Sequence, residues 1–146
     1  MWNNTAPTSS VFSVGTNSET NGNTFSFVAY LWSEIEGFSK FGSYTGNGST
    51  DGPFVWCGFR PRYVLIKSTG TENWSVQDSA RNPYNVVDAR LKPNSADAEA
   101  VSSFQYVDFL SNGFKLRNTD TEKNGSGTTY VFAAFAENPF KYSRAR

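Results

Sequence analysis

Residues 130–135 read Tyr-Val-Phe-Ala-Ala-Phe, a short run of aromatic and β-branched side chains that favours a β-strand. Four further runs have the same character, at residues 11–14, 24–32, 54–56 and 63–67. Clusters of Asn, Asp and Gly that favour hairpin turns separate them: Asn21-Gly22, Gly46-Asn47-Gly48, Asp51-Gly52, Asn112-Gly113 and Asn124-Gly125-Ser126-Gly127. The sequence therefore predicts an all-β protein, an antiparallel β-sandwich of jelly-roll-like type with short hairpins.

Helix is expected at one place at most, near residues 95–101. Asn94 or Ser95 could cap such a helix, and acidic side chains would fall in its first turn. Pro83 and Pro93 bracket the preceding segment, which is expected to cross the surface or to form an edge strand because proline cannot donate to a central ladder.

The length of 146 residues predicts a single folded domain. We expect residues 1–10 to be a truncated linker from an upstream domain and residues 11–146 to form one sandwich. An internal repeat relates residues 16–36 to residues 119–139 at a spacing of 103 residues. Each copy is a polar Asn-Gly turn followed by an aromatic strand that ends in Glu. The repeat is interpreted either as two equivalent hairpins that pair in one sheet or as a chance match between two similar strands.

Composition excludes several function classes. The 13 basic and 13 acidic residues cancel, and no basic cluster is present, so nucleic acid is not an expected partner. The chain has no His, which removes the Ser-His-Asp triad and most zinc and haem sites, and no metal or cofactor is expected. No apolar run approaches the roughly 20 residues that span a bilayer, so membrane insertion is not expected either. The lone Cys57 is expected to be a buried thiol.

A glycosidase would need two carboxylates about 5 to 10 Å apart, one of them kept protonated by its surroundings. Glu34 and Glu36 lie on one face of a predicted strand end, but nothing nearby in sequence is arranged to raise either pKa. We interpret them as a solvated strand end and expect no enzymatic activity.

A ligand-binding surface is predicted from the aromatic and charged residues that follow the strand at 63–67. An aromatic face stacks on a sugar ring while Arg, Asp and Asn bond its hydroxyl groups. The predicted binding residues are Trp74, Asp78, Arg81 and Tyr84. Trp56 and Tyr63 belong to the same dense stretch but are expected to fill the core.

Three longer strings, at residues 36–54, 58–67 and 133–142, resemble a domain that recurs in structural proteins of tailed bacteriophages, often tail fibres or tail spikes. The resemblance extends from Val11 to Arg146. It includes Trp74, Asp78 and Arg81 and the string Phe-Leu-Ser-Asn-Gly-Phe-Lys-Leu at residues 109–116. It implies a β-rich virion protein and carries no catalytic residues with it.

The expected function is that of a virion module of a phage tail fibre or appendage that contributes to host attachment through weak, multivalent contacts. Expected partners are further copies of the chain in a homotrimer, other tail or appendage proteins, and a host glycan or outer-membrane receptor. The protein would be made in the bacterial cytoplasm and reside in the virion. Two alternatives stay open: a purely structural connector, trimerisation or capsid-decoration domain, and a polysaccharide depolymerase module of a tail spike.

Overall fold

The computed structural model describes residues 3–139, so residues 1–2 of the predicted linker and residues 140–146 of the predicted domain lie outside the described part. The chain divides into two compact units, with the boundary in the sequence between Trp32 and Ser33, and each is described by itself. The second unit is an antiparallel β-sandwich, which confirms the predicted fold class.

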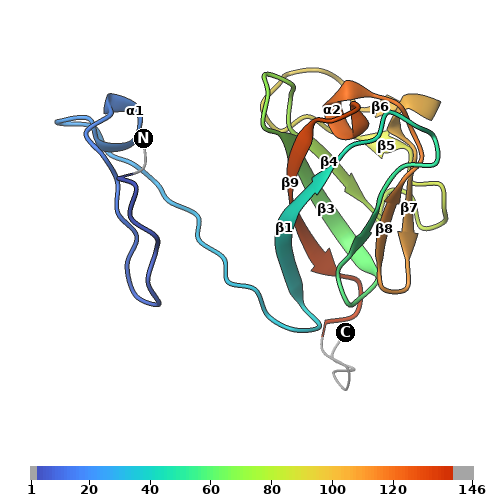
Figure 1. Ribbon diagram of the computed structural model, residues 1–146, viewed down its shortest axis with the longest axis horizontal. Helices are drawn as coiled ribbons and strands as arrows, with labels where there is room; N and C mark the ends of the chain where they lie inside the picture. Colours follow the sequence, from blue (N-terminus) through green and yellow to red (C-terminus); the bar gives the residue numbers. More distant parts are fainter. Residues whose placement is uncertain (1–2, 140–146) are drawn as a thin grey trace. The chain divides into compact units, whose positions relative to one another are not determined.

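The larger sheet of the sandwich contains four strands in the order β1-β9-β3-β4 (Figure 1). Strand β1 (Ser39–Thr45) lies at one edge and β4 (Ser75–Asp78) at the other. Between them lie β9 (Thr129–Ala136) and β3 (Pro61–Ser68). Strand β9 is antiparallel to both of its neighbours, so its backbone is paired along both edges.

The smaller sheet contains β2 (Phe54–Trp56), β8 (Gly113–Leu116) and β7 (Val107–Leu110), in that order. Strands β7 and β8 form a hairpin that turns at residues 111–112, one residue before the predicted turn at Asn112-Gly113. A two-stranded pair, β5 (Ala89–Arg90) with β6 (Ala100–Val101), completes the strands.

The core lies between the two sheets and follows the two-residue period of the strands. In β9 the inward residues Tyr130, Phe132 and Ala134 are buried, whereas Val131 between them is exposed. They pack with buried side chains from β2, β3, β7 and β8: Val55, Val64, Ile66, Phe109, Phe114 and Leu116. The positive φ of Gly127 (71°) supplies the turn that leads into β9, where the sequence predicted one.

The strands predicted over residues 11–14 and 24–32 do not form among the described residues. The first unit instead contains the four-residue helix α1 (Ser18–Asn21), and residues 24–32 are exposed and belong to no helix or strand. The boundary of the sandwich therefore lies near residue 33, not near residue 11. The pairing predicted between the two repeat copies is also wrong, because β9 pairs with β1 and β3. A segment with a strand-like pattern forms a β-ladder only when a neighbouring strand offers an unpaired edge.

The helix expected near residues 95–101 does not form. Ser95 accepts from the backbone N–H of Asp97 in a local turn, and residues 100–101 belong to β6. This side-chain bond offers the backbone an alternative to helix. Within residues 33–139, the helical elements are the 3-10 helix η1 (Ser103–Gln105) and α2 (Thr121–Asn124). None of the helices within residues 3–139 has the length and apolar character needed to cross a bilayer.

Candidate ligand-binding site

The predicted binding residues are distributed along and beyond β4. Trp74 immediately precedes this strand and is 39% exposed, with its backbone N–H donating to Oδ1 of Asn94 at 3.0 Å. Asp78 ends the same strand, four residues on, a separation of about 13 Å in an extended chain. Tyr84 is almost fully exposed. The structure therefore does not assemble Trp74 and Asp78 into one contact site.

Asp78 and Arg81 do come together, as an ion pair of 2.6 Å between Oδ2 and Nε. The other carboxylate oxygen of Asp78 accepts from the backbone N–H groups of Ala80 and Arg81. Burial raises the pKa of Asp78, but its bonds to Arg81 and Ala80 outweigh burial and lower the pKa overall. Arg81 also pairs with Glu99. These contacts fix a turn and occupy the polar atoms that a ligand would use.

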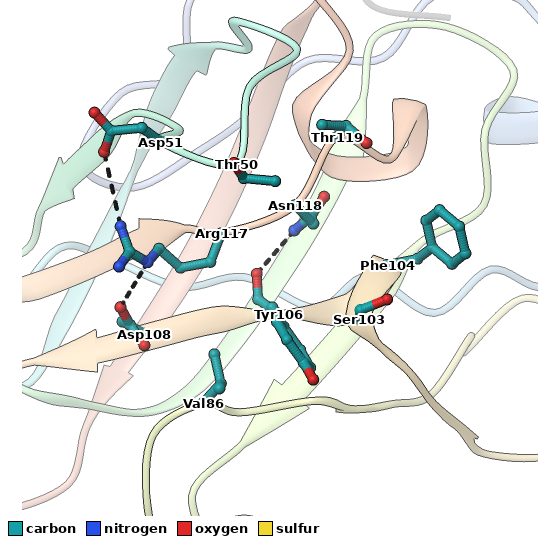
Figure 2. A pocket seen from close by; sticks show the side chains of 10 residues that line it. All are labelled: Thr50, Asp51, Val86, Ser103, Phe104, Tyr106, Asp108, Arg117, Asn118 and Thr119. Atoms are coloured by element: carbon teal, nitrogen blue, oxygen red, sulfur yellow. Dashed lines mark hydrogen bonds and ion pairs between the residues drawn. The ribbon is translucent and has the colours of Figure 1, made fainter.

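A cavity of about 610 Å³ opens elsewhere, between the β1–β2 loop, β7 and the segment that follows β8 (Figure 2). None of the four predicted binding residues lines it. Its walls come from three distant parts of the sequence, around residues 50–51, 103–108 and 117–119, together with Val86.

Arg117 organises the charged side of this cavity. Its Nε lies 3.1 Å from Oδ2 of Asp108, and its Nη1 lies 3.7 Å from Oδ1 of Asp51 (Figure 2). Lys115 approaches the same Asp51 oxygen to 2.8 Å, and the hydrogen bond from Lys115, followed by its charge, lowers the pKa of Asp51. The carboxylate of Asp51 is largely exposed, so one anion and one guanidinium face solvent at the mouth.

The aromatic side of the cavity comes from Phe104 and Tyr106. Phe104 lies in η1 and is 61% exposed, which is unusual for a phenylalanine in a folded domain. The backbone of Tyr106 is held from two directions, because its carbonyl accepts from Asn118 Nδ2 and from the Arg117 N–H, both at 2.9 Å. This connection fixes the aromatic side of the cavity relative to the charged side.

The site therefore combines an open aromatic face with a guanidinium, two carboxylates and the neighbouring hydroxyl groups of Thr50 and Ser103. An aromatic face binds the C–H surface of a sugar ring, and the polar groups can donate to and accept from its hydroxyls. Such a shallow, mixed surface suits a neutral or weakly charged polar ligand.

Glu34 and Glu36 line a second, smaller cavity of about 270 Å³ beside Trp56 and Cys57. Nζ of Lys40 lies 2.6 Å from Oε1 of Glu34, and this hydrogen bond lowers the pKa of Glu34. A general acid of a glycosidase needs the opposite shift, so this pair gives no support to hydrolysis.

Two residues of the dense aromatic stretch lie outside the core, contrary to prediction. Trp56 is 59% exposed, with Nζ of Lys40 5.6 Å from the centre of its ring. Tyr63 lies on the outer face of the large sheet, opposite Phe135. In β2 Val55 points to the core and Trp56 away from it, and in β3 Val64 points to the core and Tyr63 away, so the single-residue register decides these two environments.

A buried polar centre lies under α2. Lys123 is fully buried, and its Nζ donates to Oε1 of the buried Gln105. Burial is the main cause that lowers the pKa of Lys123 to about 7. Glu122 beside it forms an ion pair with Arg90, and Gln77 Nε2 donates to the Gln105 carbonyl at 2.6 Å. We interpret this centre as structural, because neither described cavity includes any of these side chains.

Sequence reasoning missed the larger cavity. Asp51 was recognised as part of a turn and residues 109–116 as part of a family string, but Phe104, Asp108 and Arg117 were not singled out. The only signal available from sequence is the chemical type of these residues, because the fold alone brings their three segments together.

Comparison with known proteins gives one family assignment. No curated protein and no solved structure matches the sequence. A family model described as a domain of unknown function, DUF7483, matches residues 1–139. Because this match covers nearly the whole length, the chain belongs to the DUF7483 family.

Proposed function

We propose that this chain is a non-enzymatic structural module of a virion appendage, of the tail-fibre kind, that contributes to host attachment by binding a surface glycan. The resemblance of residues 36–54, 58–67 and 133–142 to phage tail proteins supports the virion assignment. The observation that carries the binding role is the cavity in which exposed Phe104 lies on the same rim as Arg117.

Phe104 supplies the stacking face in this proposal, and Arg117 with Asp51 supplies hydrogen bonds to sugar hydroxyls. Arg117 is already oriented by Asp108, so little rotamer freedom is lost when a ligand binds. One shallow site of this kind binds weakly, with a dissociation constant on the order of a millimolar.

Weak sites are effective in an appendage because several copies act together. Linking copies raises the effective concentration of the second and third contact, and overall avidity can exceed single-site affinity by about 100-fold or more. We therefore propose a homotrimer as the working form, attached to other tail or appendage proteins.

The test is binding of the purified chain to a panel of bacterial surface polysaccharides, displayed at high density, with light scattering to give its solution mass. The variants are Phe104→Ala in the cavity and Trp74→Ala on the surface predicted from sequence. Phe54→Ala is the matched control, since Phe54 is a partly exposed phenylalanine outside the cavity.

Loss of binding in Phe104→Ala, with binding retained in Phe54→Ala and an unchanged mass, is the expected result. Loss in Trp74→Ala alone would move the site to the β4 surface. A chain that binds no polysaccharide would favour the connector or decoration alternative. Release of reducing ends that disappears in Glu34→Gln would favour the depolymerase alternative.

A further inference from the structure

The internal repeat has a structural counterpart in two short helices. Helix α1 (Ser18–Asn21) and helix α2 (Thr121–Asn124) occupy equivalent positions of the two copies, 103 residues apart. Each is four residues long, and each is followed by a glycine, Gly22 or Gly125, in extended conformation. Agreement in element, length and flanking residues favours two equivalent copies over a chance match of composition, the second interpretation of the repeat.

In the second copy, this helix leads into the strand that closes the sandwich. Strand β9 lies between β1 and β3 and pairs with both. Its inward residues Tyr130, Phe132 and Ala134 are buried in the core, and its outward residue Val131 is exposed. The segment formed by α2 and β9, residues 120–136, is called the closing segment below.

In the first copy, the equivalent strand positions carry the same pattern but have no sheet. Phe27, Ala29 and Leu31 correspond to the inward residues Tyr130, Phe132 and Ala134. Phe27 is 48% exposed and Leu31 70% exposed, and residues 24–33 belong to none of the strand ladders found within residues 3–139. A run of strand-forming side chains whose two edges are both unpaired is a strand without its neighbours.

We propose that residues 17–33 are a second closing segment, which completes another sandwich of this same family by inserting its strand between that sandwich's equivalents of β1 and β3. The partner is a DUF7483-type sandwich that lacks a closing strand of its own. Phe27, Ala29 and Leu31 would enter its core, and Val28 would lie on its outer face, as Val131 does in β9.

The sandwich formed by residues 33–139 is not a suitable acceptor, because its own β9 already occupies the place between β1 and β3. The remaining edges of its large sheet are those of β1 and of β4, and β4 is already bridged to Leu91 at Val76. Pairing there would place the segment against one strand only, and it would not reproduce the two-sided pairing of the copy that it resembles.

This arrangement would join successive sandwiches by an exchanged strand instead of a flexible linker. The closing strand of one sandwich would then be covalently continuous with β1 of the next through residues 34–38. The inference does not depend on the proposed glycan site.

The experiment provides the missing acceptor on the same chain. The tandem variant begins with an extra copy of residues 33–118, a sandwich without its closing segment, and continues directly with residue 16 and the rest of the chain. Residues 17–33 then follow this unclosed sandwich at the same spacing at which residues 120–136 follow it in the full chain. Hydrogen exchange of the amides of residues 26–33 is compared with that in the full chain. We expect exchange in the tandem to be slower by about 100-fold or more, because ladder amides open only with the sandwich.

Two matched substitutions in the tandem separate insertion from nonspecific collapse. Leu31→Asp places a charge at a core position and should abolish the protection, whereas Val28→Asp lies at the outward position and should leave it largely intact. Both residues are exposed in the full chain. Unprotected amides, or equal effects of the two substitutions, would overturn the proposal. Protection already present in the full chain would also overturn it, since the segment would then pair without an acceptor.

A second variant tests the proposal even if the added sandwich of the tandem does not fold. In this variant of the full chain, residues 16–36 replace residues 119–139. Cooperative unfolding by urea, lost when the grafted copy carries Leu31→Asp, would support the closing role. Loss of cooperative unfolding in the graft itself would overturn it.

Discussion

Asn17 and Asp120 cap two helices in the same way at positions 103 residues apart. Oδ1 of Asn17 accepts from the backbone N–H of Glu19 at 2.8 Å, and Oδ1 of Asp120 accepts from the backbone N–H of Glu122 at 2.8 Å. Helix α2 is buried after its first residue, whereas α1 has no buried residue. The local sequence thus determines the turn in both copies, but the surrounding sheet determines whether its polar groups become part of a core.

The equivalent residues Asn124 and Asn21 should therefore respond differently to truncation. Asn124 is fully buried, and its side chain donates to the carbonyls of Ser49 (2.8 Å) and Asn118 (2.6 Å) and accepts from the N–H of Asn47 (2.9 Å). Asn124→Ala leaves these three groups without partners, so the free energy of unfolding should fall by about 2 to 4 kcal/mol. Urea unfolding followed by tryptophan fluorescence measures the change.

Asn21→Ala is the control for this comparison. Asn21 is exposed and its side chain donates one bond, to the carbonyl of Gly15 at 3.1 Å. The expected change is below about 0.5 kcal/mol. Comparable losses in the two variants would contradict the different roles assigned to the two copies.

Lys123 should make stability rise with pH just above neutrality. Burial, the largest cause, lowers its pKa from 10.5 to about 7 in the folded protein. Above about pH 7 the unfolded chain therefore binds more protons than the folded one, and the free energy of unfolding should increase by up to about 1.4 kcal/mol per pH unit. Below that pH both states are protonated and the effect is constant. Urea unfolding at pH values between about 7 and about 8.5 tests this slope.

Lys123→Met should remove the slope in that window. The window ends before pH 9 because burial raises the pKa of Cys57 from 9.0 to about 12, which makes stability fall as pH rises further. A wild-type protein with a flat profile, or a Met variant that keeps the rise, would show that another group titrates.

Cys57 should be nearly inert in the folded protein. Its thiol is buried, and burial raises its pKa to about 12, so the reactive thiolate is scarce at pH 8. Labelling by iodoacetamide should be slower by about 100-fold or more than in urea. Ser111→Cys in a Cys57→Ala background is the control, because Ser111 lies exposed in the β7–β8 turn. Equal labelling rates for the two cysteines would mean that the Cys57 site opens readily.

The sequence predicted several strands whose apolar pattern is strong and missed β1, whose pattern is weak. Residues 54–56, 63–67 and 130–135 lie in β2, β3 and β9. Strand β1 reads Ser-Lys-Phe-Gly-Ser-Tyr-Thr, which has few apolar residues, and it forms because β9 offers it a paired edge. Residues 24–32 form no strand for the opposite reason: their apolar pattern is strong, but no neighbouring strand pairs with them.

The candidate site was less predictable than the fold. Asp78 and Arg81 are close in sequence and do form a contact, but they bond each other. Arg117 and Asp108, by contrast, approach to 3.1 Å because their positions follow from the β7–β8 hairpin register, which a single sequence does not specify. Sites assembled across strands depend on such registers, so residue types alone cannot locate them.

Tyr130 should report on the joint between α2 and β9. Its hydroxyl donates to the carbonyl of Thr121 at 2.5 Å and accepts from the N–H of Gly125 at 2.7 Å, while its ring stacks on Tyr44 in the core. Tyr130→Phe keeps the ring but leaves two backbone groups without their partner. The free energy of unfolding should therefore fall by about 1 to 3 kcal/mol.

The control for Tyr130→Phe is Tyr84→Phe, which removes a hydroxyl from an exposed ring and should change stability by less than about 0.5 kcal/mol.

Phe27 stands at the position equivalent to Tyr130 in the first copy, so Tyr130→Phe makes the two copies alike at this site. A closing strand without the hydroxyl should still insert, since the buried ring carries most of the apolar contact. The near-ultraviolet circular dichroism of Tyr130→Phe should thus keep the native aromatic signal at urea concentrations below the unfolding midpoint of the variant, which is lower than that of the wild type. A lost signal in the absence of urea would show that the hydroxyl bonds, not the ring, hold β9 in the sheet.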